Sequence, residues 1–308
     1  PLPVGPEHLL TPRTASTYDC EGYRLENVLF ESWPGWEVNA TVYIPTDFDP
    51  PYPAVVVPVG HSGKQFEDYQ GPCQVFARCG YLAILFDPPG QAGEKQAGND
   101  HWRDGVRSYL LGRTSSRFFV ADALRCIDYL GTRGDVDLSH GVAMTGVSGG
   151  GKTTVFASAL DDRITVRGPC CCLSPMGEAD IAMALPPCPE TFFPGRFPAM
   201  LDDTDMLLAG YPAPSCILAG LHDTLRKPER KHADYEHILR VYAVGRQENR
   251  LDMFFDDASH AYTVTMALQF VSFMNRWLLG QPDRPVPDIH PQECVPDHYD
   301  MLRASPRP

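Results

Sequence analysis

The sequence has no apolar run of about 20 residues, the length needed to cross a membrane, and it has no excess of basic residues. Its 26 lysines and arginines are outnumbered by 39 acidic residues, so the formal net charge is -13. Nucleic acids and anionic membrane surfaces both attract positively charged partners. We therefore expect neither nucleic acid nor membrane among the partners of this chain.

The chain also lacks the usual patterns of metal and redox sites. It has ten cysteines but no CxxC pair, and ten histidines but no HExxH motif. Cys170, Cys171 and Cys172 stand together in a strand-like apolar run, which favours buried thiols over a disulfide framework. We expect no metal and a cytoplasmic location. A secreted location stays open if a leader was removed ahead of Pro1.

The sequence does contain a regular alternation of strand-like and helix-like segments. Alternating residues on either side of Pro34-Gly35 predict a hairpin of strands 27–31 and 38–44. Continuous apolar runs at 54–59 and 82–86 are typical of strands buried on both faces of a parallel sheet. The same criteria predict further strands at 141–146, 164–173, 215–219 and 251–255, and helices at 69–79, 115–130, 152–160, 229–244 and 262–279.

This alternation predicts one α/β domain over residues 26–280, with a mainly parallel central sheet flanked by helices. Residues 1–25 are predicted to form an irregular arm, and the Pro-rich residues 281–308 a tail over the surface. The proline-containing segment 174–200 is predicted to be a lid or substrate loop. Whether the chain forms a homo-oligomer is left open.

The segment between the strand at 141–146 and the following helix matches two unrelated motifs. Gly146, Ser148 and Gly150 form G-x-S-x-G, the nucleophile elbow, in which a serine occupies a strained strand-to-helix turn. Gly146, together with the stretch Gly151-Lys152-Thr153, also forms G-x-x-x-x-G-K-[ST], a P-loop that would cradle phosphates. Either motif alone is weak evidence, so residues elsewhere in the chain must decide between them.

Two later strands supply the partners that an elbow serine needs. Asp223 follows the strand at 215–219, and His260 follows the strand at 251–255. Their order after Ser148 is the Ser, Asp, His order of this kind of hydrolase. A P-loop needs a magnesium-binding acid instead, and Asp87 precedes the loop. The sequence therefore favours the hydrolase, with a P-loop nucleotide hydrolase and a catalytically silent binding protein as alternatives.

The chemistry expected of each residue follows from its side chain. His260 would take the proton of Ser148, and Asp223 would orient the imidazole. Glu178 and Asp180, after the preceding strand, are alternative acids. The oxyanion would be stabilised by the Gly149 N–H and, from the loop after the strand at 54–59, by the Ser62 N–H.

Two basic residues near the elbow are candidates for substrate contact. Lys152 lies one helical turn beyond the serine, and His61 lies in the predicted oxyanion loop. Each also has a plainer interpretation, Lys152 as a solvated helix residue and His61 as a brace of its own loop.

Ordered stretches over about residues 43–279 resemble acetyl-xylan-esterase-like α/β-hydrolases, which are related to dienelactone hydrolases and prolyl-oligopeptidase-type enzymes. The matching stretches are 60–64 (GHSGK), Tyr69-Gln70, 86–94 (FDPPGQAGE), 146–151 (GVSGGG), 159–163 (ALDDR), His222-Asp223 and 259–262 (SHAY).

The resemblance implies an α/β-hydrolase fold and a carboxylic ester hydrolase with a Ser-His-Asp triad, no cofactor and a small-molecule or carbohydrate ester as substrate. Acetylated sugar is one candidate for that ester. Lys152 also resembles a basic residue of glucuronoyl esterases, but Gly149 stands where those enzymes have an arginine.

Overall fold

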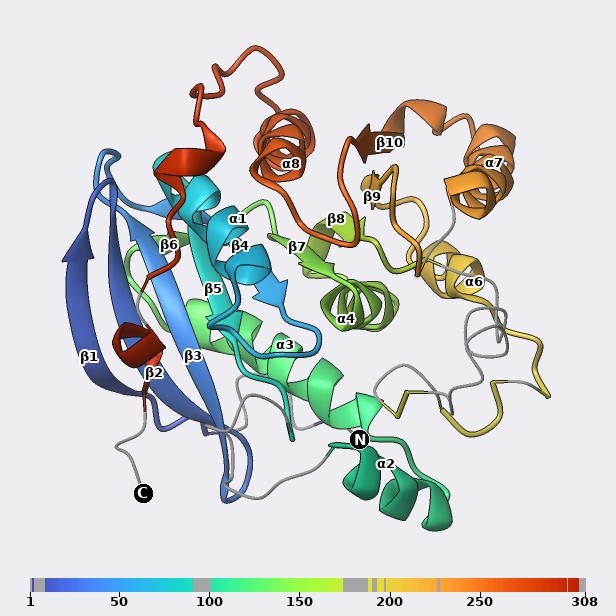
Figure 1. Ribbon diagram of the computed structural model, residues 1–308, viewed down its shortest axis with the longest axis horizontal. Coiled ribbons are helices and arrows are strands. Elements are labelled where there is room, and N and C mark those ends of the chain that lie inside the picture. Colours follow the sequence, from blue (N-terminus) through green and yellow to red (C-terminus); the bar gives the residue numbers. More distant parts are fainter. Residues whose placement is uncertain are drawn as a thin grey trace.

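The computed structural model describes residues 2, 9–90, 101–173, 188–189, 193–196, 198–225, 228–297 and 299–304, and Figure 1 shows their arrangement. The strands are β1 Arg13–Cys20, β2 Tyr23–Trp33, β3 Trp36–Pro45, β4 Tyr52–Pro58, β5 Leu82–Phe86, β6 Val136–Asp137, β7 Val142–Val147, β8 Ile164–Cys170, β9 Ser215–Gly220 and β10 Leu251–Asp256. The helices are α1 Glu67–Arg78, α2 His101–Leu110, α3 Ser116–Leu130, α4 Gly149–Ser158, α6 Asp203–Leu208, α7 Pro228–Val244 and α8 Val264–Trp277, with short 3-10 turns at Glu248–Arg250, Pro291–Glu293 and Tyr299–Leu302.

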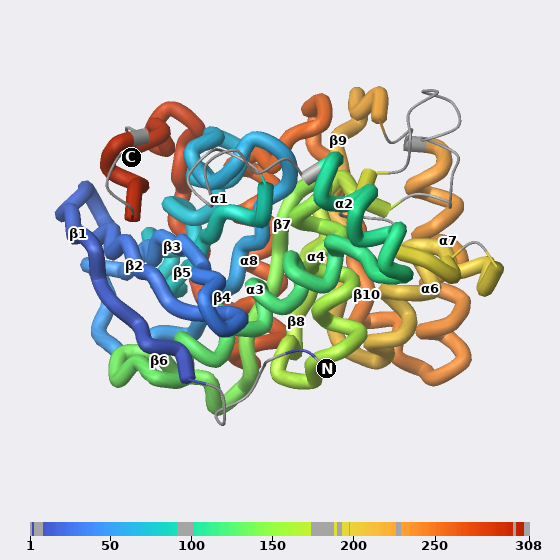
Figure 2. Tube along the Cα trace, turned by 90° about the horizontal axis from the view of Figure 1, so that it is seen from below, coloured from blue at the N-terminus to red at the C-terminus, as the bar shows by residue number. Residues whose placement is uncertain are grey.

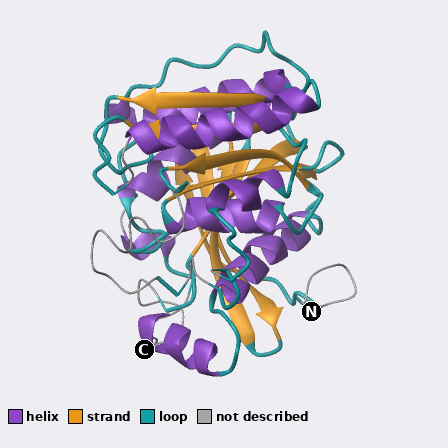
Figure 3. Ribbon diagram, turned by 90° about the vertical axis from the view of Figure 1, so that its right-hand side faces the viewer, coloured by secondary structure: helices purple, strands orange, loops and turns teal. Residues whose placement is uncertain are grey.

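One twisted sheet runs through the molecule in the order β1-β2-β3-β5-β4-β7-β8-β9-β10, and β6 pairs with β4. The pairs from β1 to β5 along this order are antiparallel, whereas the pairs from β5 to β10 are parallel. Helices cover both faces of the sheet (Figure 3). This is the α/β-hydrolase architecture that the sequence predicted.

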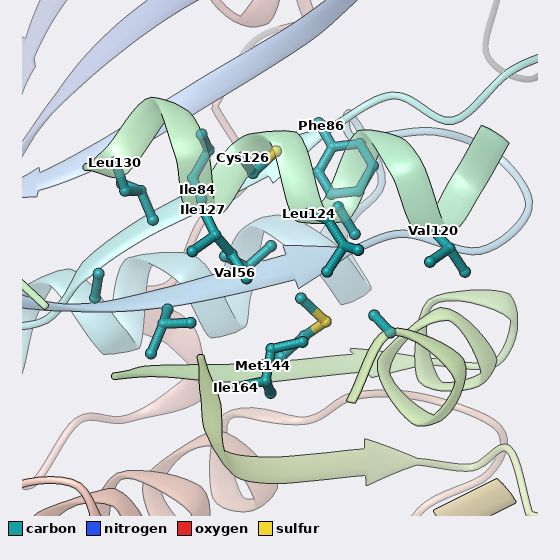
Figure 4. Packing of buried hydrophobic residues seen from close by; sticks show 14 of the residues in the cluster. Val56, Ile84, Phe86, Val120, Leu124, Cys126, Ile127, Leu130, Met144 and Ile164 are labelled. Carbon is teal, nitrogen blue, oxygen red and sulfur yellow. The ribbon is translucent and has the colours of Figure 1, made fainter. Parts of the chain in front are cut away.

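Alternating side chains of the central strands divide the interior into two hydrophobic cores. In β4, Val56 faces the core covered by α3 and α4, while Val55 and Val57 face the core covered by α1 and α8. The period of two residues in a strand produces this division, so strands buried on both faces have no polar alternation in sequence. Figure 4 shows the first core, where Leu124 and Ile127 of α3 pack over Val56.

The predicted hairpin, the six further strands and the five helices are confirmed with shifted ends, whereas the irregular arm at 1–25 is wrong in part. Residues Arg13–Cys20 form β1, which pairs antiparallel with β2. This edge strand is mostly exposed, so it lacks the apolar pattern that marks the other strands. Helices α2 and α6 were not predicted, and α4 begins at Gly149, before the predicted start at residue 152.

The C-terminal tail does more than lie over the surface. It crosses to the antiparallel end of the sheet (Figure 2), where Leu302 is fully buried. Asn27 Nδ2 donates to Met301 O at 2.6 Å, and the Tyr23 hydroxyl contacts the Asp297 carboxylate at 2.9 Å. The tail therefore completes one edge of the hydrophobic core.

Three further predictions concern the rest of the chain. The predicted lid or substrate loop at 174–200 falls mostly outside the described residues. Seven of the ten cysteines are buried, as predicted. Among the described residues, no helix has both the length and the apolar character needed to span a bilayer.

If the tail is part of the core, Leu302→Ala should lower the free energy of unfolding by about 2–5 kcal/mol, because it removes fully buried methyl groups. Val295→Ala is the matched control, since Val295 belongs to the same tail but is 68% exposed; it should change the free energy by less than about 0.5 kcal/mol. Urea denaturation measures both. If Leu302→Ala changed the free energy of unfolding as little as Val295→Ala, the tail would not contribute to folding stability.

Candidate active site

The sheet topology brings the predicted site residues to one edge. Strands β7, β8, β9 and β10 are consecutive parallel neighbours, so their carboxyl ends lie side by side. Ser148 directly follows β7, Asp223 follows β9, and His260 follows β10. Active sites of α/β proteins form at such an edge, where loops from neighbouring strands meet.

Ser148 occupies a strained turn between β7 and α4. Its backbone has φ 58° and ψ -118°, in the left-handed range that L side chains seldom adopt. A Cβ atom at Gly146 would lie 2.4 Å from Pro58 O, and one at Gly150 would lie 2.0 Å from the same oxygen. Both glycines of G-x-S-x-G are therefore required because β7 and α4 press against the end of β4. The Ser148 N–H is held by Cys170 O at 3.0 Å.

The loop after β4 lies against the residue that follows the serine. A Cβ atom at Gly60 would lie 3.0 Å from Gly149 N, so the two backbones are in close approach. The loop is fixed by Tyr69, whose hydroxyl donates to His61 O at 2.7 Å, and Ser62 has a positive φ of 87°. His61 Nε2 contacts the Cys188 thiol at 3.5 Å. The structure thus brings the predicted oxyanion loop next to Gly149.

Asp223 and His260 form a hydrogen-bonded pair. His260 Nδ1 lies 3.0 Å from Asp223 Oδ2, and the Asp223 side chain is fully buried. The other carboxylate oxygen accepts the Leu225 N–H at 2.9 Å. Burial raises the pKa of Asp223, but the hydrogen bonds and charges of His260 and Lys231 outweigh it and lower this pKa to about 2. The carboxylate is therefore ionised at neutral and mildly acidic pH.

The second nitrogen of His260 is left available. Nε2 is buried, and no described residue makes a hydrogen bond with it. A buried polar atom without a partner is uncommon and often marks a functional position. Glu178 and Asp180, the alternative acids, lie outside the described residues.

Two residues that the sequence did not predict contact this pair. Lys231, in the first turns of α7, places its ammonium 3.0 Å from Asp223 Oδ2. Cys171, directly after β8, has its thiol within 4.8 Å of ligand atoms of Asp223 and His260. Cys171, Asp223 and His260 could offer a metal ion a thiol, a carboxylate and an imidazole. However, the Lys231 ammonium is already bound to the carboxylate and would repel a cation. The absence of a metal stays a prediction.

Lys152 is engaged in the interior rather than presented to a ligand. Its ammonium forms an ion pair with Asp203 of α6, in which the two side chains are 5% and 0% exposed. Arg196 binds the other oxygen of Asp203 at 2.8 Å. This placement does not support Lys152 as a substrate contact.

The P-loop interpretation is wrong for the same reason. A P-loop lysine must reach phosphate, whereas Lys152 is bound to Asp203. The backbone N–H groups of a P-loop must also be available to cradle phosphates. Here α4 begins at Gly149, and the Lys152 N–H already donates to Ser148 O at 3.0 Å.

The family model described as acetyl xylan esterase (AXE1) matches residues 6–171, more than half of the chain. The chain belongs to the acetyl xylan esterase family. Membership places it among carboxylic ester hydrolases and confirms the predicted family. The match includes Ser148 but ends before Asp223 and His260, so the assignment of those two residues rests on the geometry above. No curated protein matches the sequence.

Solved structures similar to this family member share its fold. A methylesterase, BT1017, has a TM-score of 0.76 and 21% identity; the match covers 96% of this chain but only 63% of the methylesterase. A glucuronoyl esterase from Solibacter usitatus has a TM-score of 0.67 and 15% identity over 86% of this chain and 85% of the esterase. Acetyl Xylan Esterase 1 from Thermoanaerobacterium sp. JW/SL YS485 has a TM-score of 0.59 and 17% identity over 85% of this chain and 87% of that enzyme.

Asp234 of α7 lies beside the Lys152–Asp203 ion pair and is poorly accommodated as an anion. Its Oδ2 is buried and makes no hydrogen bond with any described residue. Burial and the nearby charge of Asp203 raise the pKa of Asp234 to about 6. The folded protein therefore binds this proton more tightly than the unfolded chain, whose aspartates titrate near pH 3.9.

It follows that Asp234 lowers the free energy of unfolding progressively as the pH rises from about 4 through about 6. Asp234→Asn should raise the melting temperature by a few degrees at pH 8 and leave it nearly unchanged at pH 4. Asp283→Asn, which removes the same charge from an exposed position, serves as the control and should show no such difference. A gain at pH 4 as large as that at pH 8 would contradict this assignment.

Proposed function

We propose that the protein is a serine carboxylic ester hydrolase in which Ser148 is the nucleophile, His260 the base and Asp223 the residue that orients it. The observation that carries the proposal is the His260 imidazole, bound through Nδ1 to a buried carboxylate and buried without a partner at Nε2. A triad base needs this arrangement, because one nitrogen must be fixed while the other exchanges a proton. The strained elbow at Ser148 supplies the hydroxyl at the same sheet edge.

The reaction proceeds in two halves. His260 Nε2 accepts the proton of Ser148 Oγ as this oxygen bonds to the ester carbonyl carbon, and the resulting imidazolium then gives the proton to the departing alcohol. The acyl group remains on Ser148. In the second half, water attacks the acyl-serine, His260 takes one proton from that water and returns it to Ser148, and the carboxylic acid is released.

The negative charge on the carbonyl oxygen would be stabilised by two backbone donors. Gly149 N–H is one, since it follows the nucleophile and begins α4, where helix N–H groups have no partner within the helix. Ser62 N–H is the second, because its loop lies against Gly149. This chemistry requires no metal or organic cofactor.

The substrate that we propose is a carbohydrate ester, with an O-acetyl group as the first candidate. The family description names acetyl xylan esterase, and the structural relatives include esterases of acetylated, methylated and glucuronoyl compounds by their names. The position of Lys152 does not discriminate between these esters, because its ammonium is bound to Asp203.

Ser148→Ala tests the nucleophile. It should lower kcat for 4-nitrophenyl acetate and for acetylated xylan by more than about 1,000-fold, because it removes the hydroxyl that would form the acyl intermediate. Ser158→Ala is the matched control: Ser158 ends the same helix, and its hydroxyl donates to Val155 O. The wild type and Ser158→Ala should also be labelled by a fluorophosphonate, whereas Ser148→Ala should not. Turnover retained by Ser148→Ala would refute the triad.

A further inference from the structure

A lysine is buried against the proposed triad. Lys231 Nζ lies 3.0 Å from Asp223 Oδ2 and 3.4 Å from Gly220 O, and its side chain is only 4% exposed. Lysine is seldom found so deeply buried, because removing an ammonium from water is costly unless a charge compensates it. Here the compensating charge is the carboxylate that also binds the proposed base.

Lys231 and His260 share a single oxygen atom. Both Lys231 Nζ and His260 Nδ1 lie 3.0 Å from Asp223 Oδ2, so the two nitrogens are at most about 6 Å apart, within the range in which a charge changes the proton affinity of its neighbour. When the imidazole is neutral, the Asp223 carboxylate and the Lys231 ammonium balance each other. When it is protonated, two positive charges compete for one carboxylate.

We propose that Lys231 is a positioning residue of the triad: its ammonium fixes the Asp223 carboxylate that orients His260, and its charge opposes protonation of the imidazole. The inference rests on the function proposed above. During turnover the same ammonium makes the transient imidazolium a stronger acid, which favours proton delivery to the departing alcohol.

The other charged and titratable groups near the pair do not supply this effect. Cys171, from the end of β8, lies within 4.8 Å of the pair and is a neutral or anionic group. Asp68 of α1 interacts electrostatically with His260 and carries the opposite sign. As anions both would favour the protonated imidazole, so Lys231 is the group among these described neighbours that opposes it.

Lys231→Met, which keeps the length of the side chain and removes the charge, tests this role. The readout is the acid limb of the pH profile of kcat/KM, which reports protonation of the free enzyme's base. In Lys231→Met this limb should move to higher pH by about one unit, whereas Lys231→Arg should restore it toward the wild type. A limb that does not move in Lys231→Met would overturn the inference.

A variant with a comparable structural defect elsewhere separates this effect from loss of stability. Arg125→Met breaks the buried Arg125–Asp128 ion pair of α3, whose side chains are 1% and 4% exposed. It should lower the melting temperature without moving the acid limb. An equal displacement of the limb in Arg125→Met would mean that Lys231 has only a structural role.

If Lys231→Met folds poorly, inactivation by a fluorophosphonate provides a second measurement. The rate constant of this inactivation at each pH does not depend on how much of the protein is folded. The pH at which this rate constant falls to half should be about one unit higher than in the wild type. A wild type that does not react with the phosphonate would overturn the proposed function and this inference with it. A reactive wild type with an unmoved limb in Lys231→Met would overturn the role of Lys231 alone.

Discussion

The close approach of the nucleophile turn to the end of β4 is the constraint on which the rest of the site depends. Cβ atoms at Gly146 and Gly150 would lie only 2.4 Å and 2.0 Å from Pro58 O, so neither position accepts a side chain. This contact forces the chain to reverse at Ser148 with a positive φ and starts α4 immediately afterwards. It also presses the loop after β4 against Gly149, where the proposed oxyanion donors meet.

The remaining parts of the site follow from strand order rather than from local sequence. Consecutive parallel strands bring Asp223 and His260 to the edge where Ser148 stands. Burial of the Asp223 carboxylate alone would favour its neutral form, and the surrounding donors reverse that preference. The fold thereby keeps an anion inside the protein at the point where the proposed mechanism forms a transient imidazolium.

Sequence patterns predicted the parts of the structure that have a recognisable local sequence signature. The buried strands have uninterrupted apolar runs, and the elbow has a fixed motif, so the sheet and Ser148 could be located. Strand β1 could not, because an exposed edge strand has no apolar face. The start of α4 was missed since glycine is a poor helix former, although sterics demand it there. Lys231 and Lys152 look like ordinary helix residues in the sequence, and only the structure reveals their aspartate partners, 8 and 51 residues away.

The described lysines are buried in ion pairs, whereas lysine in most proteins is exposed to solvent. The lysines that the structure describes, Lys64, Lys152 and Lys231, are all buried, and each lies beside an aspartate, Asp87, Asp203 and Asp223 in turn. Buried ion pairs add little net stability because desolvation offsets their attraction, but breaking one is costly. Such pairs fix geometry more than they stabilise the fold. Their positions agree with this, since they join the loop after β4 to that after β5, the nucleophile helix to α6, and the proposed triad acid to α7.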